Sequence, residues 1–466
     1  MTEVQKLAGF VSSRSYNHLT QNAIRELKIR LLDSLGCAIA AIKGKPIKAL
    51  KEQLDDFGGN PLVSLIGGGK TAPDRAAFYN SALVRYLDFN DSYLAKNETC
   101  HPSDNIGSVL AAADYADKSG QEFLTALAIA YQVQCRLSDV APVRDKGYDH
   151  TVQGGYGTAA GVSYALGLDA EKTANALAIA GTAYNALRVT RTGNLSNWKG
   201  LAFPSTGWTA THSAFLAMRG ITGPEEVFEG NKGFKQTIAG DFEIDWQEED
   251  LEKVTQTIIK RYNAEIHSQA TLEGIQDLML LYKIDPEQIE KIVLNTFDVA
   301  FNIIGGGEEG AKKNISTKEE ADHSLPYLMA VLILDGNVLP AQYLPARIIK
   351  DDVQQLLQKV FVYEKKEYSD RFPNEVACDI TITLKDGTIL KVDKKDYSGF
   401  LSRPASWEKI VEKFNNLAMP YADELLREQI IKLVNNFDNH KVKDLMALLE
   451  KVGKTVPGKR FQFTNN

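Results

Sequence analysis

Apolar residues recur at helical spacing through the first 250 residues of the chain. In residues 21–43 they include Ile24, Leu27, Leu31, Leu35 and Ile39, which fall on one face of a helix. Comparable patterns predict helices over residues 46–58, 76–87, 104–117, 124–137, 158–166, 172–183 and 209–218. The N-terminal half is therefore expected to be almost wholly helical.

The pattern changes near residue 255. Short β-rich runs predict strands over residues 258–262, 291–297, 360–363, 377–384 and 388–392, with a hairpin turn at Lys385-Asp386-Gly387. Helices are expected over residues 269–282 and 319–334, and helical spacing returns from residue 404 to about 451. We therefore predict a mostly α protein. A large discontinuous all-helical domain covers residues 1–257 and 395–466, and an inserted α+β domain covers residues 258–394.

Composition narrows the class of protein. The chain has 466 residues, a formal net charge of −7 and 44% hydrophobic residues, an ordinary mixture for a globular protein. The acidic balance argues against a nucleic-acid binder. No uncharged apolar run is long enough for a membrane span, and the N-terminus lacks the pattern of a signal peptide. A cytoplasmic protein that binds neither nucleic acid nor membrane is expected.

The spacing of the four cysteines indicates which metal sites the chain could form. Cys37, Cys100, Cys135 and Cys378 are far apart, with no Cys-x-x-Cys pair. Zinc sites and iron–sulfur clusters normally take closely spaced ligands. The spacing therefore argues against a zinc site and an iron–sulfur cluster, and we expect no metal.

Residues 85–105 gather side chains suited to acid–base chemistry. Asp88 and Asp91 lie three apart and would share a helix face if the preceding helix continued that far. Ser103 has the character of an N-cap, which places His101 just outside a helix N-terminus, where anions are favoured. Acid–base work on an anionic substrate needs such groups, although a simple capping device with solvated acids would give the same pattern.

Two later segments add candidates. His150 precedes a helix rich in alanine and glycine, and the loop from residue 185 to 200 carries Arg188, Arg191 and Lys199. Such cations can hold carboxylates, while the alternative is a solvated basic loop. His212 lies among apolar positions and is expected to pack in the core.

Several motifs, taken together and in order, resemble one known family. They are Leu87-Asp-Phe-Asn-Asp-Ser92, His101-Pro-Ser-Asp-Asn105, Asp149-His150, Ala186-Leu-Arg188, Trp198-Lys199, Ala264-Glu265-Ile-His267-Ser-Gln269 and Asp322-His323-Ser-Leu-Pro-Tyr327. The chain resembles the MmgE/PrpD family over roughly residues 5–420, and most closely its dehydratase branch. The resemblance implies a large helical domain, a smaller α+β lid domain, a homodimer and cofactor-independent chemistry on tricarboxylates.

The resemblance also suggests which activity to expect. Glu265 matches the dehydratases, whereas the decarboxylase branch places a histidine there, so dehydration of 2-methylcitrate or a related 2-hydroxy tricarboxylate is expected. The chain departs from the family pattern at Asn263, at Ile266 and at Phe400, which stands where the family has histidine. A decarboxylase or epimerase on the same fold, a non-catalytic anion-binding scaffold, and a metal enzyme using Asp88, Asp91 and His101 are the alternatives.

The expected site residues follow from these motifs and from the chemistry. His101 and His150 are expected to be the acid–base pair, with Asp88 orienting an imidazole and Lys199 binding charge. His323 is either a site residue or a structural residue of the insert. The residues expected to bind substrate are Ser92, Arg188, Arg191, Lys260, Arg261, Glu265, His267, Tyr327 and Arg403.

Overall fold

The computed structural model describes residues 1–453, and the chain divides into two compact units. The helical unit contains Met1–Thr190, Gly200–Thr257 and the chain from Ser406 onward, and the mixed unit contains Arg191–Lys199 and Ile258–Ala405. The short segment Arg191–Lys199 therefore groups with the mixed unit, although its neighbours on both sides belong to the helical one. Each unit is described by itself below.

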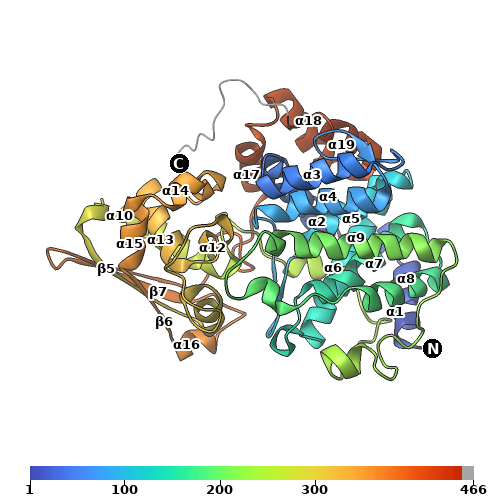
Figure 1. The fold of residues 1–466 in the computed structure, drawn as a ribbon, viewed down its shortest axis with the longest axis horizontal. Helices are drawn as coiled ribbons and strands as arrows, with labels where there is room; N and C mark the ends of the chain where they lie inside the picture. The colour runs from blue at the N-terminus through green and yellow to red at the C-terminus, as the bar shows by residue number, and fades with distance from the viewer. Residues whose placement is uncertain (454–466) are drawn as a thin grey trace. The chain divides into compact units, whose positions relative to one another are not determined.

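Long helices build the helical unit (Figure 1). They are α1 (Glu3–Ser13), α2 (Gln21–Ala41), α3 (Lys45–Phe57), α4 (Pro73–Tyr86), α5 (Ile106–Tyr115), α6 (Gly120–Val140), α7 (Thr151–Leu166), α8 (Ala170–Ala183), α9 (Trp198–Met218), α17 (Trp407–Ala418), α18 (Glu424–Asn435) and α19 (Val442–Leu449). Two short antiparallel hairpins, β1 (Val63–Ser64) with β2 (Lys70–Thr71) and β3 (Tyr93–Leu94) with β4 (Thr99–Cys100), interrupt the helices.

Small residues bring α6 and α7 into close contact. A Cβ added at Gly157 would lie 2.8 Å from the carbonyl oxygen of Ala130, and one added at Gly161 would lie 2.8 Å from that of Ala126. Both distances are below van der Waals contact, so any side chain there would push the helices apart. The glycines fix the position of α7, whose first residue follows His150.

The helix α2 forms the centre of the helical unit. It packs against α4 and α6, and α17 from the C-terminal part of the chain packs on it as well. Most of its residues are buried, including the charged residues Arg30 and Asp33. The N-terminal and C-terminal segments therefore share one core.

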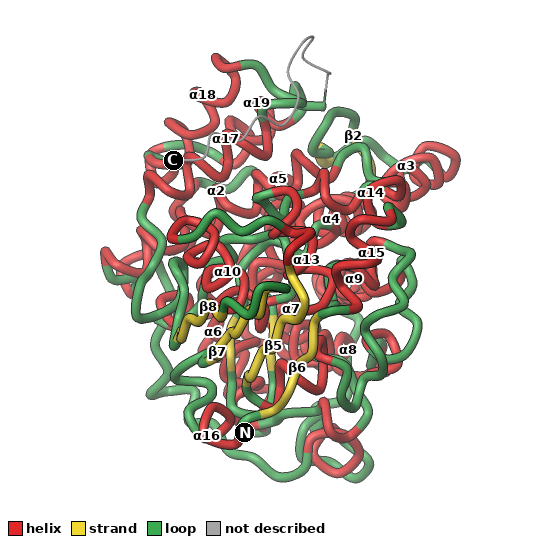
Figure 2. Tube along the Cα trace, turned by 90° about the vertical axis from the view of Figure 1, so that its left-hand side faces the viewer, coloured by secondary structure: helices red, strands yellow, loops and turns green. Residues whose placement is uncertain are grey.

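A four-stranded sheet with the order β6–β5–β7–β8 organises the mixed unit (Figure 2). The strands are β5 (Ile289–Thr296), β6 (Val360–Glu364), β7 (Cys378–Leu384) and β8 (Ile389–Lys394), and only the β5–β6 pair is parallel. The helix α10 (Gln269–Leu281) packs on β7 and β8, and α13 (Leu325–Asp335) packs on β6 and on α15 (Asp351–Gln358). Short helices α11 (Asp298–Ala300), α12 (Lys318–Ala321), α14 (Pro345–Ile348) and α16 (Lys366–Ser369) complete the unit.

The mostly α fold class with a small mixed sheet is confirmed, but two expected elements are wrong. Residues 258–262 form no strand beyond a single bridge residue at Ile258. Ile258 and Ile259 are buried, and β propensity chiefly reflects burial. The helix expected over residues 319–334 breaks at Asp322-His323-Ser324, where the Ser324 side chain caps α13. Within residues 1–453, no helix combines the length and the apolarity that crossing a bilayer requires.

Candidate functional site

The polar loop after α4 does not extend that helix. The helix ends at Tyr86, and Asp88 has a left-handed backbone with φ of 56°, a conformation that aspartate tolerates better than most residues. Arg85 Nη1 donates to Asp88 Oδ1 over 2.5 Å. The expectation that Asp88 and Asp91 share a helix face is therefore wrong, because the chain turns between them.

Asp91 holds the loop together from inside. Its Oδ1 accepts from the Ser103 N–H at 3.0 Å and from Ser103 Oγ at 2.6 Å, and its Oδ2 accepts from Tyr131 Oη at 2.8 Å. Burial raises the pKa of the Asp91 carboxyl, against the lowering effect of these donors. Ser103 is not the N-cap that the sequence suggested, because it lies within a 3₁₀ turn, Pro102–Asn105, that precedes α5.

One ring nitrogen of His101, Nδ1, is fixed within the loop. This nitrogen lies 2.8 Å from the carbonyl oxygen of Asp91 and 3.0 Å from Ser92 Oγ. A carbonyl oxygen only accepts hydrogen bonds, so Nδ1 must carry a proton. The nitrogen of His101 that can gain and lose a proton is therefore Nε2.

His150 lies beside His101. It is the residue before α7, and the two imidazole rings are 5.4 Å apart with planes inclined by 77°. Phe203 stacks 6.5 Å from the His150 ring, and a Cβ at Gly154 would overlap Phe203. The helical unit thus brings together the two histidines that the sequence predicted as a pair, and glycine at position 154 makes room for the aromatic wall.

Glu98 supports the loop that leads to His150. Its Oε2 accepts from the N–H groups of Val143 and Arg144, each at 3.1 Å, and it interacts electrostatically with Arg188. Burial raises the pKa of the Glu98 carboxyl, while these N–H donors and Arg188 lower it. Sequence reasoning missed Glu98, since a single acid in the turn between β3 and β4 carries no signal.

A largely buried ion pair between α2 and α17 supports the loop that follows α4. Lys413 Nζ, on α17, lies 2.7 Å from Asp33 Oδ1, on α2, and donates to the carbonyl oxygen of Phe89 at 2.8 Å. The ammonium also lies 3.8 Å from the centre of the Phe89 ring. Phe89 follows Asp88 directly, so Lys413 anchors the loop on which Asp88 and Ser92 lie.

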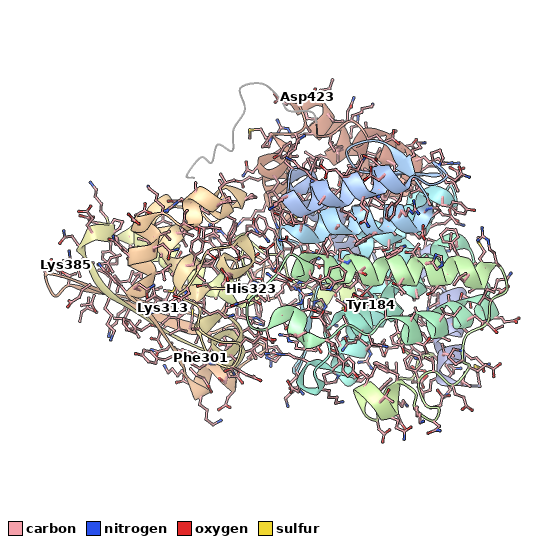
Figure 3. All side chains as sticks on the ribbon, viewed as in Figure 1. Tyr184, Phe301, Lys313, His323, Lys385 and Asp423 are labelled. Atoms are coloured by element: carbon pink, nitrogen blue, oxygen red, sulfur yellow. The ribbon has the colours of Figure 1, made fainter. Side chains whose placement is uncertain are left out.

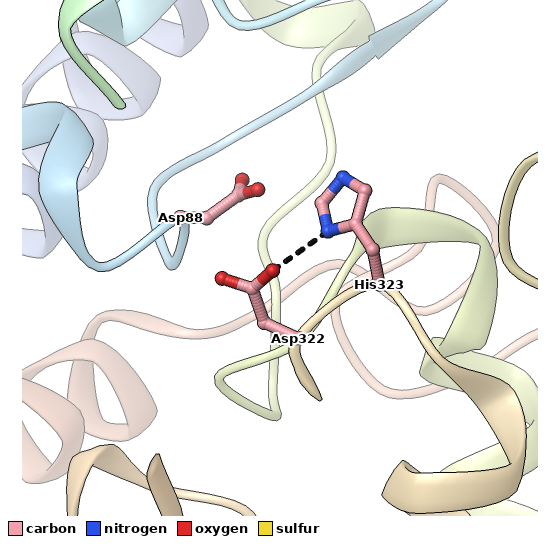
Figure 4. A group of neighbouring side chains, drawn as sticks. All are labelled: Asp88, Asp322 and His323. Atoms are coloured by element: carbon pink, nitrogen blue, oxygen red, sulfur yellow. Dashed lines mark hydrogen bonds and ion pairs between the residues drawn. The ribbon is translucent and has the colours of Figure 1, made fainter. Parts of the chain in front are cut away.

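The mixed unit collects a second group of predicted residues around Asp322. Lys199 Nζ lies 2.7 Å from Asp322 Oδ1 and 2.8 Å from His323 Nδ1, and Lys318 Nζ lies 2.6 Å from Asp322 Oδ2. Asp322 Oδ1 and His323 Nδ1 are 2.8 Å apart, and the dashed line in Figure 4 marks this contact. Burial raises the pKa of Asp322, but Lys199, Lys318 and His323 outweigh it and hold that pKa well below its ordinary value. Asp322 is therefore a carboxylate that fixes Lys199 and His323.

Glu265 and His267 form a dyad in the same unit. Glu265 Oε1 lies 2.7 Å from His267 Nδ1, and Oε2 accepts from the His267 N–H at 2.7 Å. Burial raises the pKa of Glu265, but His267, then His323 and Lys260, lower it to about 2. The imidazole packs near Phe297 and Phe372. Glu265 is thus an ionised acid that orients His267.

The other predicted cations and Tyr327 have protein partners in the mixed unit. Arg191 donates to the Lys199 carbonyl oxygen over 3.1 Å, and the Lys260 side chain is fully buried and acts electrostatically on Glu265. Tyr327 Oη donates to the Gln342 carbonyl oxygen at 2.5 Å. Both Arg261 and Arg403 pair with Glu273, at 2.9 and 2.5 Å.

One histidine lies where the sequence did not put it. His212 was expected in the core, yet its side chain is 56% exposed and its Nδ1 lies 3.1 Å from Asp74 Oδ2. The helix α9 is apolar on more than one side, so its pattern does not show which face meets solvent. His212 has no part in the acid–base group.

The two units offer different chemistry. The helical unit presents two imidazoles, His101 and His150, that can move protons. The mixed unit presents ionised acids that hold Lys199 and His267 in fixed positions, and positioned cations stabilise developing negative charge. Two buried carboxylates, Asp91 directly and Asp33 through Lys413, brace the loop that carries His101, and Glu98 braces the loop that leads to His150.

Comparison with known proteins agrees with these features. The MmgE/PrpD N-terminal domain matches residues 5–247, and the MmgE/PrpD C-terminal domain matches residues 262–439. The chain is 26% identical to a cis-aconitate decarboxylase of Mus musculus, over 93% of this chain and 90% of that protein. It is 27% identical to a mitochondrial 2-methylcitrate dehydratase of Yarrowia lipolytica, over 84% and 79%, and 28% identical to a 2-methylcitrate dehydratase of Cupriavidus necator, over 83% and 84%. With both family domains matched in order along most of its length, the chain belongs to the MmgE/PrpD family.

Proposed function

We propose that this protein is a hydro-lyase that dehydrates 2-methylcitrate, or a closely related 2-hydroxy tricarboxylate, to 2-methyl-cis-aconitate. The observation that carries the proposal is the His101–His150 pair, with rings 5.4 Å apart and Nδ1 of His101 fixed by a carbonyl oxygen. Relatives named 2-methylcitrate dehydratase support it.

Dehydration needs two proton movements. A base removes the proton from the carbon next to a carboxylate, the double bond forms, and the carbon–oxygen bond breaks while an acid protonates the departing hydroxide to water. We assign these two roles to Nε2 of His101 and to the imidazole of His150. Each positioned acid or base contributes about 10²–10⁴-fold in rate, so both are needed.

Negative charge develops on the substrate carboxylate as the proton leaves. We propose that Lys199 stabilises this negative charge, because Asp322 and His323 hold its ammonium in a fixed position. The proposal includes no metal and no cofactor, which rests on the scattered cysteines and on the Asp91 oxygens being held by Ser103 and Tyr131. The two-domain division with an α+β lid, the homodimer and the cytoplasmic location remain part of the proposal.

Decarboxylation of cis-aconitate is the second candidate, since a decarboxylase of that name is among the relatives. Glu265 favours dehydration. Its two oxygens accept from the backbone N–H and the ring of His267, and a histidine at position 265 could not accept both. Glutamate at position 265 is therefore needed to hold His267 in this way, which matches the dehydratases rather than the decarboxylase.

The test follows ultraviolet absorbance, where a conjugated carboxylate absorbs, with chelator-treated protein and 2-methylcitrate, citrate or cis-aconitate. A rise with 2-methylcitrate is expected. Loss of the cis-aconitate signal with release of carbon dioxide would favour the decarboxylase, and no change with all three would contradict both. His101→Ala and His150→Ala are each expected to lower kcat by about 100-fold or more, and a variant with wild-type kcat would remove that histidine from the mechanism.

A further inference from the structure

Lys312 lies on a fixed backbone beside the Asp322 turn. It follows the glycine-rich segment after Phe301–Gly305, and its carbonyl oxygen accepts from Ser324 Oγ at 2.6 Å. Ser324 also caps α13, where its Oγ accepts from the Tyr327 N–H at 3.1 Å. The Asp322 carbonyl oxygen in turn accepts from the Glu265 N–H at 3.1 Å. Three segments of the mixed unit are thus joined around this lysine.

Lys312 is a largely buried residue whose ammonium has no protein acceptor in the described part of the chain and still reaches solvent. The residue is 7% exposed, and within residues 1–453 its Nζ makes no hydrogen bond or ion pair. Burial lowers its pKa, and Glu309, Glu265 and Asp322 oppose that lowering from longer range. A cation with little access to water is stabilised by an anionic partner, and no described side chain supplies one to Lys312 by direct contact.

The nearby acids are already engaged. Glu265 holds His267, and Asp322 holds Lys199 and Lys318. Turning toward Lys312 would break those bonds. The missing acceptor is therefore best supplied by a ligand.

We propose that Lys312 binds an anionic oxygen of the ligand, and that in the reaction proposed above this oxygen belongs to a substrate carboxylate. The second half of the statement rests on the proposed function. Other lysines and acids interact in the same unit: Lys260 acts electrostatically on Glu265, and Lys199 forms an ion pair with Asp322. A ligand with several carboxylates suits such a surrounding.

The neighbouring Lys313 provides a matched control (labelled in Figure 3). It lies one position along the chain, but its Nζ donates to the Gln358 carbonyl oxygen at 2.8 Å and lies 4.4 Å from the centre of the Phe361 ring. Lys313→Met removes the same charge from the same segment. It leaves Lys312 in place.

The experiment compares wild type, Lys312→Met, Lys312→Arg and Lys313→Met. Citrate and 2-methylcitrate binding is measured by calorimetry, and kcat and KM are measured with 2-methylcitrate. Lys312→Met is expected to weaken binding and to lower kcat/KM by about 10- to 100-fold, as loss of a charge-assisted hydrogen bond does. Lys313→Met should match wild type, and Lys312→Arg should recover part of the loss. Lys312→Met is expected to fold, because it removes an uncompensated buried charge.

The outcomes separate the two proposals. If wild type dehydrates 2-methylcitrate but Lys312→Met behaves like Lys313→Met, the Lys312 assignment is wrong and the proposed function stands. If wild type turns over none of the tricarboxylates yet binds citrate only when Lys312 is present, the proposed function fails and the anion site stands. Binding of neither acid by wild type overturns the Lys312 assignment.

Discussion

Replacing Lys413 with methionine tests whether the buried pair beneath the histidine loop stabilises the helical unit. The change leaves Asp33 buried, with its nearest cation removed. Breaking one partner out of a buried pair typically costs about 3–5 kcal/mol. Asp33→Asn combined with Lys413→Met removes both charges, so most of the lost stability should return.

The loss of stability in Lys413→Met should depend on pH. Burial already raises the pKa of Asp33 despite Lys413, and removing Lys413 raises it further. A carboxyl whose folded pKa lies above its unfolded value binds its proton more tightly when folded. The Lys413→Met protein is therefore most stable below the unfolded pKa, and it loses stability as pH rises toward the folded pKa, by up to about 1.4 kcal/mol per pH unit.

Urea unfolding at pH 5 and pH 8 measures the free energy of unfolding of each variant. Hydrogen exchange on α2 and α17 shows whether the loss is local to these helices. Lys409→Met, an exposed lysine on the same helix, is the control. Activity should separate from stability, because the double variant recovers the core but still lacks the bond from Lys413 to the Phe89 carbonyl oxygen. A loss below about 1 kcal/mol, or equal losses at the two pH values, would refute the reasoning.

Two further predictions concern the mixed unit. Lys199→Met should lower kcat/KM with 2-methylcitrate by about 100-fold or more while the thermal melt stays cooperative, and unchanged kinetics would remove Lys199 from charge binding. Glu265→Gln should destabilise the unit by about 3 kcal/mol at pH 7, because the pKa of Glu265 falls from 4.5 to about 2 on folding. A depressed folded pKa stabilises above the unfolded value and is lost as pH falls from about 4.5 toward 2, so a urea-unfolding difference between wild type and variant that persists at low pH would contradict this.

Local patterns predicted the local structure. The apolar spacing in residues 21–43 became α2, and the Asp386-Gly387 turn joins β7 to β8. The break before α13 was missed, although Ser324 followed by Pro326 is a typical helix start. The predicted pairing of His101 with His150 came from the family resemblance, and the rings do lie together.

Contacts between residues far apart in the chain could not be predicted from the sequence. Asp33 and Lys413 lie near opposite ends of the sequence, and neither stands in a recognisable motif. Glu98 and Lys312 are ordinary charged residues until burial makes their charge matter. A single sequence shows the helix and strand propensities and the apolar periodicity, but it does not show which charged side chains become buried in the fold.

The return of α17 to α2 has a consequence for synthesis. Because Lys413 must leave the ribosome before it can bind Asp33 and Phe89, the loop that carries Asp88, Ser92 and His101 stays without this anchor until nearly the whole chain has been made. The mixed unit, complete at Ala405, has all its own residues earlier, so it can fold first. A nascent chain cut short before α17 would thus carry both histidines but lack the Lys413 anchor of the His101 loop.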